Sequence, residues 1–233
     1  MSKKQSDTLV IIPAYNEEGS IKAVVDQLRE DYPQFDYVVI NDGSKDQTSA
    51  ICHANGFNII DLPTNLGLSG AVQTGFKYAY QNGYDQAVQF DADGQHLPEY
   101  IAPLVAAIKE GNDCAIGSRF ATQERHKSLR MLGNTLISNI ISLTTGQKIA
   151  DPTSGMRMFN KQLIKEFATN INYTPEPDTI SHLIRQGKKV VEVQVSMQER
   201  QAGQSYLTLS RSINYMVHMV ISILFIQGFR RKN

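Results

Sequence analysis

Short apolar runs alternate with helical patterns through the first half of this 233-residue sequence, and this alternation limits the fold more than any other feature. Five runs rich in aliphatic residues have the length of strands that are buried on both faces. They are 8–12, 37–40, 58–62, 87–90 and 114–116. The intervening patterns predict helices over 20–30, 48–55, 68–82 and 98–110. This alternation predicts an α/β fold, in which helices cover both faces of an open, mostly parallel sheet.

The second half of the sequence changes pattern after residue 119. Helices are predicted over 129–145, 161–169 and about 176–186. The segment 189–197 alternates in part between apolar and polar residues, which is typical of a strand with one wet face at a sheet edge. Because no long linker or repeat interrupts the pattern, we predict one domain over residues 1–207, followed by a C-terminal helix within 208–233.

Acidic residues follow three of the predicted strands at the same end. Glu17 follows the first strand, Asp42 the second, and Asp91 and Asp93 the fourth. Ligands of parallel sheets bind outside the carboxyl ends of the strands, so acids that recur there indicate a nucleotide site. Two carboxylates beside a strand-breaking Gly94 suit Mg²⁺ or Mn²⁺ carrying substrate phosphates. Taken alone, the aspartate pair also fits a solvated turn, and Glu17 or Asp42 a helix cap.

Charge and cysteine content set the broad class. Lys and Arg number 23, as do Asp and Glu, and this balance gives no support to nucleic-acid binding, which usually shows as a basic surplus. Cys52 and Cys114 lack metal-ligand spacing and fit reduced thiols. The polar N-terminus shows no signal-peptide pattern. These features predict a cytoplasmic protein.

The C-terminal segment is apolar with a basic end. Residues 215–226 are heavily apolar, but Asn214, His218 and Ser222 recur at intervals of four and predict an amphipathic helix with a narrow polar stripe. This run is shorter than the roughly 20 apolar residues that span a bilayer. With the basic cluster 230–232, it fits a helix lying in the membrane interface against anionic headgroups. The alternative is packing on the domain or on a second copy in a homo-oligomer.

Seven motifs occur in order over about residues 8–207. They are Pro13-Ala-Tyr-Asn-Glu17, Asn41-Asp-Gly-Ser-Lys-Asp-Gln-Thr48, Asn65-Leu-Gly-Leu-Ser-Gly-Ala-Val72, Asp91-Ala-Asp-Gly-Gln-His96, Gly117-Ser-Arg-Phe120, Asp151-Pro-Thr-Ser-Gly-Met-Arg157 and Glu199-Arg-Gln-Ala-Gly-Gln-Ser205. With them the chain resembles the GT-A-fold (Rossmann-like) glycosyltransferases of family 2. It is most similar to the branch of dolichol-phosphate mannose synthase and other polyprenyl-phosphate glycosyltransferases.

The resemblance implies a metal-dependent hexosyltransferase that moves a sugar from a nucleoside-diphosphate donor to polyprenyl phosphate, with inversion at the anomeric carbon. The implied cofactor is Mg²⁺ or Mn²⁺. UDP-glucose is the first donor we expect and GDP-mannose the second, with undecaprenyl phosphate as acceptor. The implied setting is cell-surface polysaccharide synthesis by a protein peripheral on the inner face of the cell membrane.

The resemblance also assigns site residues in groups. The donor nucleotide group is Pro13, Tyr15, Glu17, Asp42, Asn65, Gly67, Gly70 and Asp91. The metal group is Asp91, Asp93 and Gln95. The acceptor phosphate group is Arg119, Arg200 and Ser205, since guanidinium pairs with phosphate bidentately. Arg130, which lies in none of the seven motifs, is added to this group on its charge alone. The expected catalytic residues are Asp93, Asp151, Arg119 and Arg200. Asp151 would orient the acceptor or act as base, or else only cap a helix, and His96 would sit near the site or have no role.

Two features depart from the family pattern. Tyr206 follows Ser205, where the synthases usually have lysine, and no clear pair of transmembrane helices follows the domain. Two alternatives therefore stay open: a family 2 transferase that extends a lipid-linked glycan, with Asp151 as base, and a non-catalytic scaffold that binds nucleotide sugars. The intact pair Asp91 and Asp93 argues against the scaffold. A nucleotidyltransferase is disfavoured, because no glycine-rich loop with Lys or Arg follows the first strand.

Overall fold

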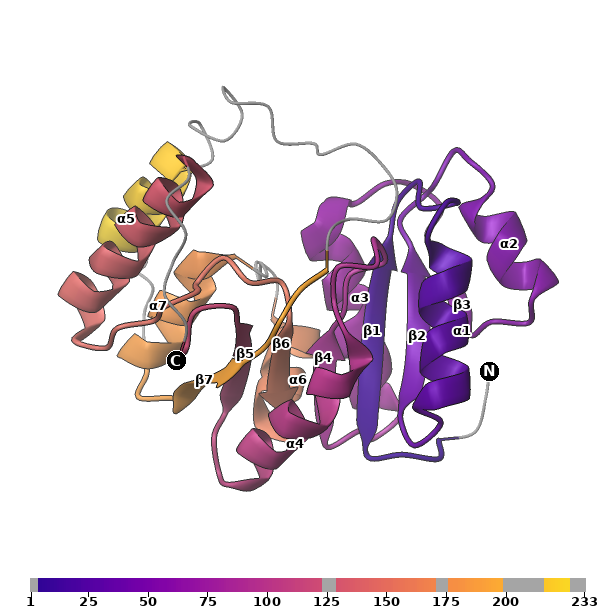
Figure 1. The fold of residues 1–233 in the computed structure, drawn as a ribbon, viewed down its shortest axis with the longest axis horizontal. Helices are drawn as coiled ribbons and strands as arrows, with labels where there is room; N and C mark the ends of the chain where they lie inside the picture. The colour runs from indigo at the N-terminus through magenta and orange to yellow at the C-terminus, as the bar shows by residue number, and fades with distance from the viewer. Residues whose placement is uncertain (1–3, 123–128, 171–175, 199–215, 227–233) are drawn as a thin grey trace.

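The computed structural model describes residues 4–122, 129–170, 176–198 and 216–226. Within these ranges the centre is a seven-stranded sheet with the order β3-β2-β1-β4-β6-β5-β7 (Figure 1). The strands are β1 (Thr8–Ala14), β2 (Asp36–Asn41), β3 (Ile59–Asp61), β4 (Gln86–Gln89), β5 (Cys114–Ser118), β6 (Arg157–Asn160) and β7 (Val190–Gln194). Strand β6 runs antiparallel to β4 and β5, and the other pairs are parallel. The predicted mostly parallel sheet is confirmed, and β7 lies at its edge as expected.

Helices connect these strands where the sequence predicted them. They are α1 (Ile21–Asp31), α2 (Thr48–Ala54), α3 (Gly67–Gln81), α4 (Ile101–Lys109), α5 (Leu129–Thr145), α6 (Lys161–Thr169) and α7 (Pro177–Arg185). Helix α1 illustrates the cause: Ile21, Val24, Val25 and Leu28 recur at helical spacing, and all four are buried. The helix expected from Pro98 begins as a 3₁₀ turn, Pro98–Tyr100, before α4.

Two hydrophobic cores lie on opposite faces of the sheet. In β1, Leu9 and Ile11 belong to one core, while Val10 and Ile12 point the other way into the second. Side chains of α3, α5, α6 and α7 complete the first core, and those of α1, α2 and α4 the second. Strands that are buried on both faces explain why the sequence shows continuous apolar runs rather than alternation.

Strand β6 is missing from the sequence-based prediction, which leaves residues 151–159 without an element. It is short, and its first residue is charged, so its pattern does not indicate a buried strand. Arg157 is nonetheless 1% exposed. Its guanidinium donates to the carbonyl oxygens of Pro152 (2.7 Å), Ser154 (2.8 Å) and Glu176 (3.1 Å). These contacts offset the cost of burying the charge, and they fix the loop that precedes β6.

The C-terminal helix packs on the domain over its described part, residues 216–226 (Figure 1). The last turn that the structure describes, Ser222–Ile226, is π-helical. Ser222 donates to Asp178 Oδ2 of α7 at 2.7 Å, and Arg185 Nη2 donates to the Ile223 carbonyl oxygen at 3.1 Å. The expected polar stripe is therefore divided: Ser222 is buried against α7, and His218 is exposed. Asn214, the predicted boundary at 207/208 and the basic cluster 230–232 lie outside the described residues.

Among the residues described, no helix combines the length and the hydropathy of a bilayer-spanning segment.

Candidate active site

A pocket of about 390 Å³ opens at the carboxyl ends of β1, β2 and β4. Strand β1 lies between β2 and β4, so the chain switches direction of winding there, where α/β sheets bind their ligands. The pocket brings together most of the predicted donor and metal residues: Pro13, Tyr15, Glu17, Asp42, Asn65, Gly67, Asp91 and Asp93. Gly70 and Gln95 do not line it; Gly70 packs under the side chain of Leu66.

The loops after β2 and β3 that border this pocket are held to one another by hydrogen bonds and close packing. Asp42 is 3% exposed, and its Oδ1 accepts the backbone N–H of Leu66 at 2.7 Å. Gly43 has φ +66°, and a Cβ there would lie 2.8 Å from the backbone nitrogen of Asn65, so glycine is required. Asp42 Oδ2 accepts no hydrogen bond from the residues that the structure describes, which leaves this oxygen for a ligand.

The loop after β1 is held by the loop after β2. Asn16 adopts a left-handed conformation with φ 56°, and its Oδ1 accepts the backbone N–H of Lys45 at 2.8 Å. The backbone N–H of Glu17 donates to Thr48 Oγ1 at 2.8 Å, and Ser20 Oγ donates to Glu17 Oε2 at 3.1 Å. Both loops therefore present fixed carboxylates to the pocket.

The turn after β4 fixes the two aspartates. Asp93 Oδ1 accepts the backbone N–H of Gln95 at 3.0 Å, and Gly94 (φ 78°) provides the turn. Asp91 Oδ1 accepts from Gln89 Nε2 at 3.2 Å. The sequence left the role of His96 open; it is 4% exposed, and its Nδ1 accepts the backbone N–H of Asp91 at 2.9 Å. In the neutral ring the proton is then on Nε2, which lies 3.6 Å from Asp91 Oδ2.

The donor atoms in this turn fit a hard divalent cation. Among the described residues, no group of three or more His, Cys, Asp and Glu side chains forms a ready-made metal cluster. Mg²⁺ is usually held by one or two carboxylates together with substrate phosphates rather than by an all-protein cage. Asp91 and Asp93, which share the pocket, match that pattern. Gln95 contributes its backbone to Asp93, and its side chain as a ligand stays a prediction.

Asp151 and Arg119 form an ion pair beside the pocket. Asp151 is fully buried; its Oδ2 accepts from Arg119 Nε at 2.7 Å, and its Oδ1 accepts from Nη2 at 2.8 Å. The backbone N–H of Arg119 adds a third bond to Oδ2 at 3.1 Å. The hydrogen bond to Asp151 raises the pKa of Arg119 above its usual value. The Arg119 side chain is 37% exposed, and its Nη1 takes no partner among the described residues.

The loop 151–155 contacts both halves of the site. Its first residue, Asp151, holds Arg119, and its last residue, Gly155, lies against Asp91 of the pocket. A Cβ on Gly155 would lie 2.7 Å from Asp91 Oδ2, so only glycine lets this loop approach the carboxylate without displacing it. Because Asp151 precedes no helix in the structure, the helix-cap interpretation is wrong.

Sequence reasoning missed two contributors to this arrangement. Glu192 in β7 accepts the backbone N–H groups of Ala150 and Asp151, both at 2.7 Å, and so anchors the loop from the sheet edge. Its position on the wet face of a predicted edge strand gave no sign of this role. Gly155 carried a signal only as part of its motif. Arg130 lies in α5, but its side chain is not described, and Arg200 and Ser205 lie outside the described residues.

Fold and pocket together define a nucleotide-binding α/β protein with an aspartate pair at its switch point. Residues 9–167 match glycosyl transferase family 2, and the chain belongs to that family and is a glycosyltransferase. It is 31% identical to polyprenol monophosphomannose synthase of Mycolicibacterium smegmatis, over 86% of this chain and 81% of the relative. It is 36% identical to UDP-N-acetylglucosamine–dolichyl-phosphate N-acetylglucosaminyltransferase of Methanococcus voltae, over 67% and 70%.

Solved structures agree with the fold. The structure of glucosyl-3-phosphoglycerate synthase from Mycobacterium tuberculosis in complex with Mn²⁺, uridine diphosphate and phosphoglyceric acid superimposes with a TM-score of 0.71. The match covers 97% of this chain and 80% of that chain at 19% identity. The GT-A fold expected from the motifs is thereby confirmed.

Proposed function

We propose that this glycosyltransferase moves a hexose from a nucleoside-diphosphate sugar to polyprenyl phosphate, with inversion, while peripheral on the cytoplasmic face of the membrane. One observation carries the proposal: the loop 151–155 joins the donor pocket, at Asp91, to a partly exposed guanidinium, at Arg119. The relatives support it, because their names specify polyprenyl acceptors. Those names also specify different sugars, so we keep UDP-glucose as the first donor and GDP-mannose as the second.

The donor would lie in the pocket with its nucleoside beside β1 and β2. Asp42 Oδ2 and the Glu17 carboxylate are placed to accept hydrogen bonds from a base or from ribose hydroxyls. The diphosphate would lie toward Asn65 and Gly67, where α3 begins and backbone N–H groups favour an anion. Mg²⁺ or Mn²⁺ held by Asp91 and Asp93 would neutralise the charge that grows on the departing diphosphate.

The acceptor half needs a cation more than a base. A polyprenyl phosphate is already an anion near neutral pH, so its attack on the sugar does not depend on removal of a proton. Arg119 offers the two N–H groups of Nη1 to such a phosphate. Both oxygens of Asp151 accept from Arg119, so we assign Asp151 to orienting that guanidinium rather than to proton removal. This assignment disfavours a glycan acceptor, whose hydroxyl would need a base. Arg130, Arg200 and Ser205 remain candidates for the same phosphate.

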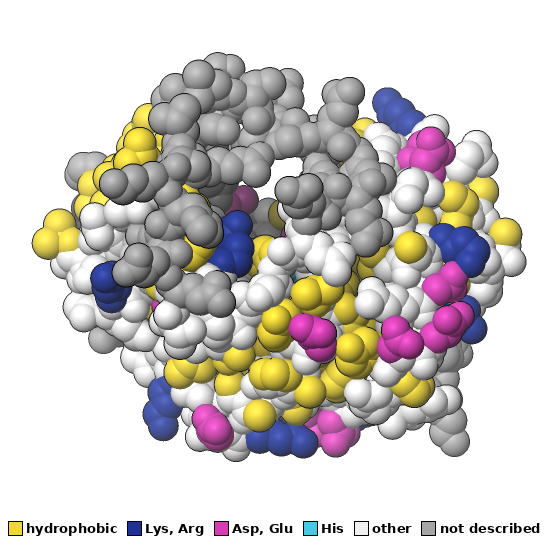
Figure 2. All heavy atoms as spheres, in the orientation of Figure 1, with side chains coloured by type: hydrophobic (Ala, Val, Ile, Leu, Met, Phe, Trp, Pro, Cys, Tyr) yellow, Lys and Arg dark blue, Asp and Glu magenta, His cyan; other side chains and the backbone are white. Residues whose placement is uncertain are grey.

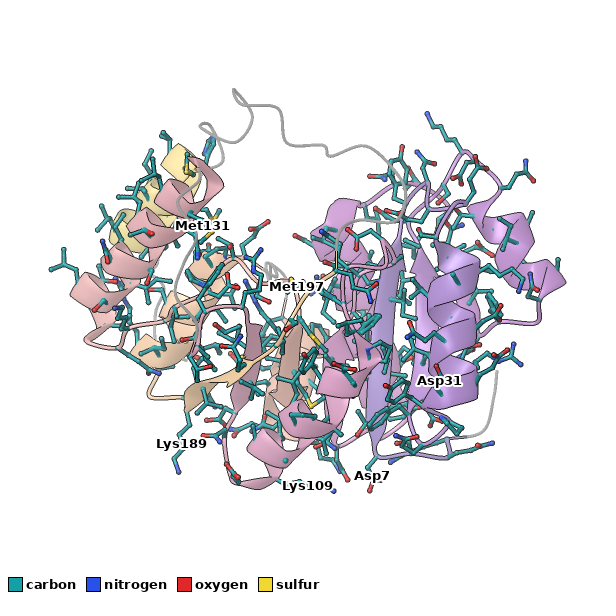
Figure 3. All side chains as sticks on the ribbon, viewed as in Figure 1. Asp7, Asp31, Lys109, Met131, Lys189 and Met197 are labelled. Atoms are coloured by element: carbon teal, nitrogen blue, oxygen red, sulfur yellow. The ribbon has the colours of Figure 1, made fainter. Side chains whose placement is uncertain are left out.

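The test is turnover of radiolabelled UDP-glucose and GDP-mannose with Mn²⁺ and undecaprenyl phosphate in detergent. Label should enter the organic phase with one donor, and both EDTA and Asp93→Asn should abolish this transfer. Lys109→Gln, at the C-terminus of α4 and far from the pocket (Figure 3), is the matched control and should transfer normally. Donor binding or hydrolysis without a lipid product would refute polyprenyl phosphate as the acceptor. Absence of metal-dependent donor binding would refute the proposed donor site.

A further inference from the structure

Strand β7 holds both partners of the ion pair between Arg119 and Asp151. It pairs in parallel with β5, so that Gln194 lies opposite Ser118, the last residue of β5 (Figure 1). Glu192 and Gln194 are two positions apart on β7 and therefore point to the same face of the sheet. Glu192 accepts the backbone N–H of Asp151 at 2.7 Å, and Gln194 Nε2 donates to the Arg119 carbonyl oxygen at 3.0 Å. One strand thus fixes each partner of the pair through a separate side chain.

The Gln194 side chain also closes the turn that follows β5. Its Oε1 accepts the backbone N–H of Thr122 at 2.7 Å and the Thr122 hydroxyl at 3.1 Å, and its Nε2 donates to the Val195 carbonyl oxygen at 2.9 Å. Together with the bond to Arg119, these contacts use every donor and acceptor of a glutamine side chain. Among the described residues, no backbone-to-backbone hydrogen bond closes the turn 119–122. The turn therefore depends on these four hydrogen bonds, which we call the Gln194 clamp.

Arg119 is consequently held at both of its backbone groups. Asp151 accepts its N–H at 3.1 Å, and Gln194 donates to its carbonyl oxygen. The guanidinium, which Asp151 aligns, has its Cζ 5.3 Å from the centroid of the Phe120 ring in the same turn. The side chain is 37% exposed, and Figure 2 shows Lys or Arg atoms exposed beside the hollow in this face of the molecule. Because rotation of the backbone at this residue would redirect Nη1, the Gln194 clamp sets the direction in which that nitrogen points.

We propose that Gln194 is a positioning residue, which fixes the backbone at Arg119 so that the guanidinium meets the acceptor phosphate in one orientation. The inference deepens the proposed function and rests on its assignment of Arg119 to that phosphate. Bidentate pairing of a guanidinium with phosphate depends on the orientation of both groups, so a turn that is free to move weakens it. Neither Gln194 nor the turn 119–122 lines the donor pocket, and the donor should therefore bind independently of the Gln194 clamp.

The substitution Gln194→Met, which keeps the length of the side chain and removes its amide, tests the proposal. The first readout is hydrogen exchange at Arg119 Nε, followed by NMR in a chain labelled with ¹⁵N-arginine and assigned with Arg119→Lys. Gln194→Met should accelerate this exchange about tenfold, because the ion pair opens to water more often without the clamp. Thr122→Val removes only one of the four hydrogen bonds and should accelerate the exchange by less.

Gln147→Met is the matched control. Gln147 Nε2 also donates to β7, at the Val190 carbonyl oxygen (2.7 Å), but it contacts neither residue of the ion pair. The same substitution there should leave the exchange at Arg119 Nε as in the wild type.

The second readout is calorimetric binding in detergent of farnesyl phosphate, a short polyprenyl phosphate, with farnesol as its uncharged counterpart. Gln194→Met should weaken the binding of farnesyl phosphate at least tenfold, about 1.4 kcal/mol. The binding of farnesol, and of UDP or GDP with Mn²⁺, should equal that of the wild type. This pattern separates the orientation of Arg119 from a general loss of structure, which would weaken every ligand.

Each outcome decides the inference. Unchanged exchange at Arg119 Nε in Gln194→Met overturns it, and so does binding of farnesyl phosphate equal to that of the wild type. Equal losses for farnesyl phosphate and the nucleotide would give Gln194 a structural role only and overturn it as well. If thermal unfolding shows that Gln194→Met does not fold, Thr122→Val decides by the same two readouts. A wild-type chain that binds no farnesyl phosphate, but in which Gln194→Met accelerates the exchange, would uphold the positioning of Arg119 and refute the proposed acceptor.

Discussion

The substitution Gly155→Ala tests how closely the loop 151–155, which we propose serves the acceptor, must approach Asp91 of the proposed donor site. The backbone of Gly155 lies outside the left-handed region, so alanine introduces contact rather than backbone strain. Its Cβ would lie 2.7 Å from Asp91 Oδ2, and 3.5 Å from both Cγ and Oδ1. An unstrained carbon–oxygen contact is about 3.3–3.6 Å, so the carboxylate or the loop must move by roughly 0.6–0.9 Å.

A displacement of this size should harm catalysis more than stability. Misplacement of a reacting group by about 1 Å costs on the order of 100-fold in rate. We expect kcat/KM for the donor to fall about 30- to 100-fold, or about 2–2.7 kcal/mol. The melting temperature should change little, because the Asp91 side chain borders the pocket and can move into it.

Initial rates with detergent-solubilised undecaprenyl phosphate, together with thermal unfolding, measure both effects. Gly111→Ala is the matched control: Gly111 follows α4 at the opposite end of the sheet, with φ +92° and open space around its Cβ position. It should lose about 1–2 kcal/mol of stability with normal kcat/KM. A Gly155→Ala chain with kcat/KM within about twofold of the wild type would refute the close approach of loop 151–155 to Asp91 as a catalytic requirement.

Three further predictions concern the metal site, the ion pair of Arg119 with Asp151, and the two buried thiols. EDTA or Asp93→Asn should lower kcat at least about 100-fold, and added Mn²⁺ should restore only the EDTA-treated wild type. Arg119→Ala leaves the buried Asp151 carboxylate without its ion-pair partner, and should lower the free energy of unfolding in urea by about 3–5 kcal/mol. Arg119→Lys should lower it by less, because it keeps a positive charge there. Burial raises the pKa of Cys52 to about 11 and that of Cys114 to about 12 from 9.0. Both thiols should therefore resist Ellman's reagent at neutral pH until unfolding, and stability should fall as pH rises above about 9, where only the unfolded thiols ionise. Rapid labelling of the native chain would contradict that assignment.

The residues of the proposed donor half could be predicted from the sequence, because they follow strands. Glu17, Asp42 and the aspartate pair come directly after apolar runs, and the geometry of a parallel sheet brings such ends together. The acceptor half was not. Arg119 and Asp151 are 32 residues apart and meet only because β6 inserts antiparallel between β4 and β5. Arg157 at the start of β6 fixes the loop before that strand through the carbonyl oxygens of Pro152 and Ser154, and no local sequence pattern encodes these contacts.

The bounds of helix α5 were predicted correctly, but the residues that it buries and exposes were not. Its bounds were predicted from the sequence as the structure has them, since apolar residues recur along 129–145. The pattern could not assign its faces: Ile137 and Ile141 are buried, and so are the polar Asn134 and Ser138, while three leucines are exposed. A polar residue inside and a leucine outside each contradict the rule for surface helices, and such exceptions concentrate where function outweighs stability. Here the buried exceptions, Asn134 and Ser138, donate to the carbonyl oxygens of Ala150 and Ile149 and so hold the start of the loop that carries Asp151.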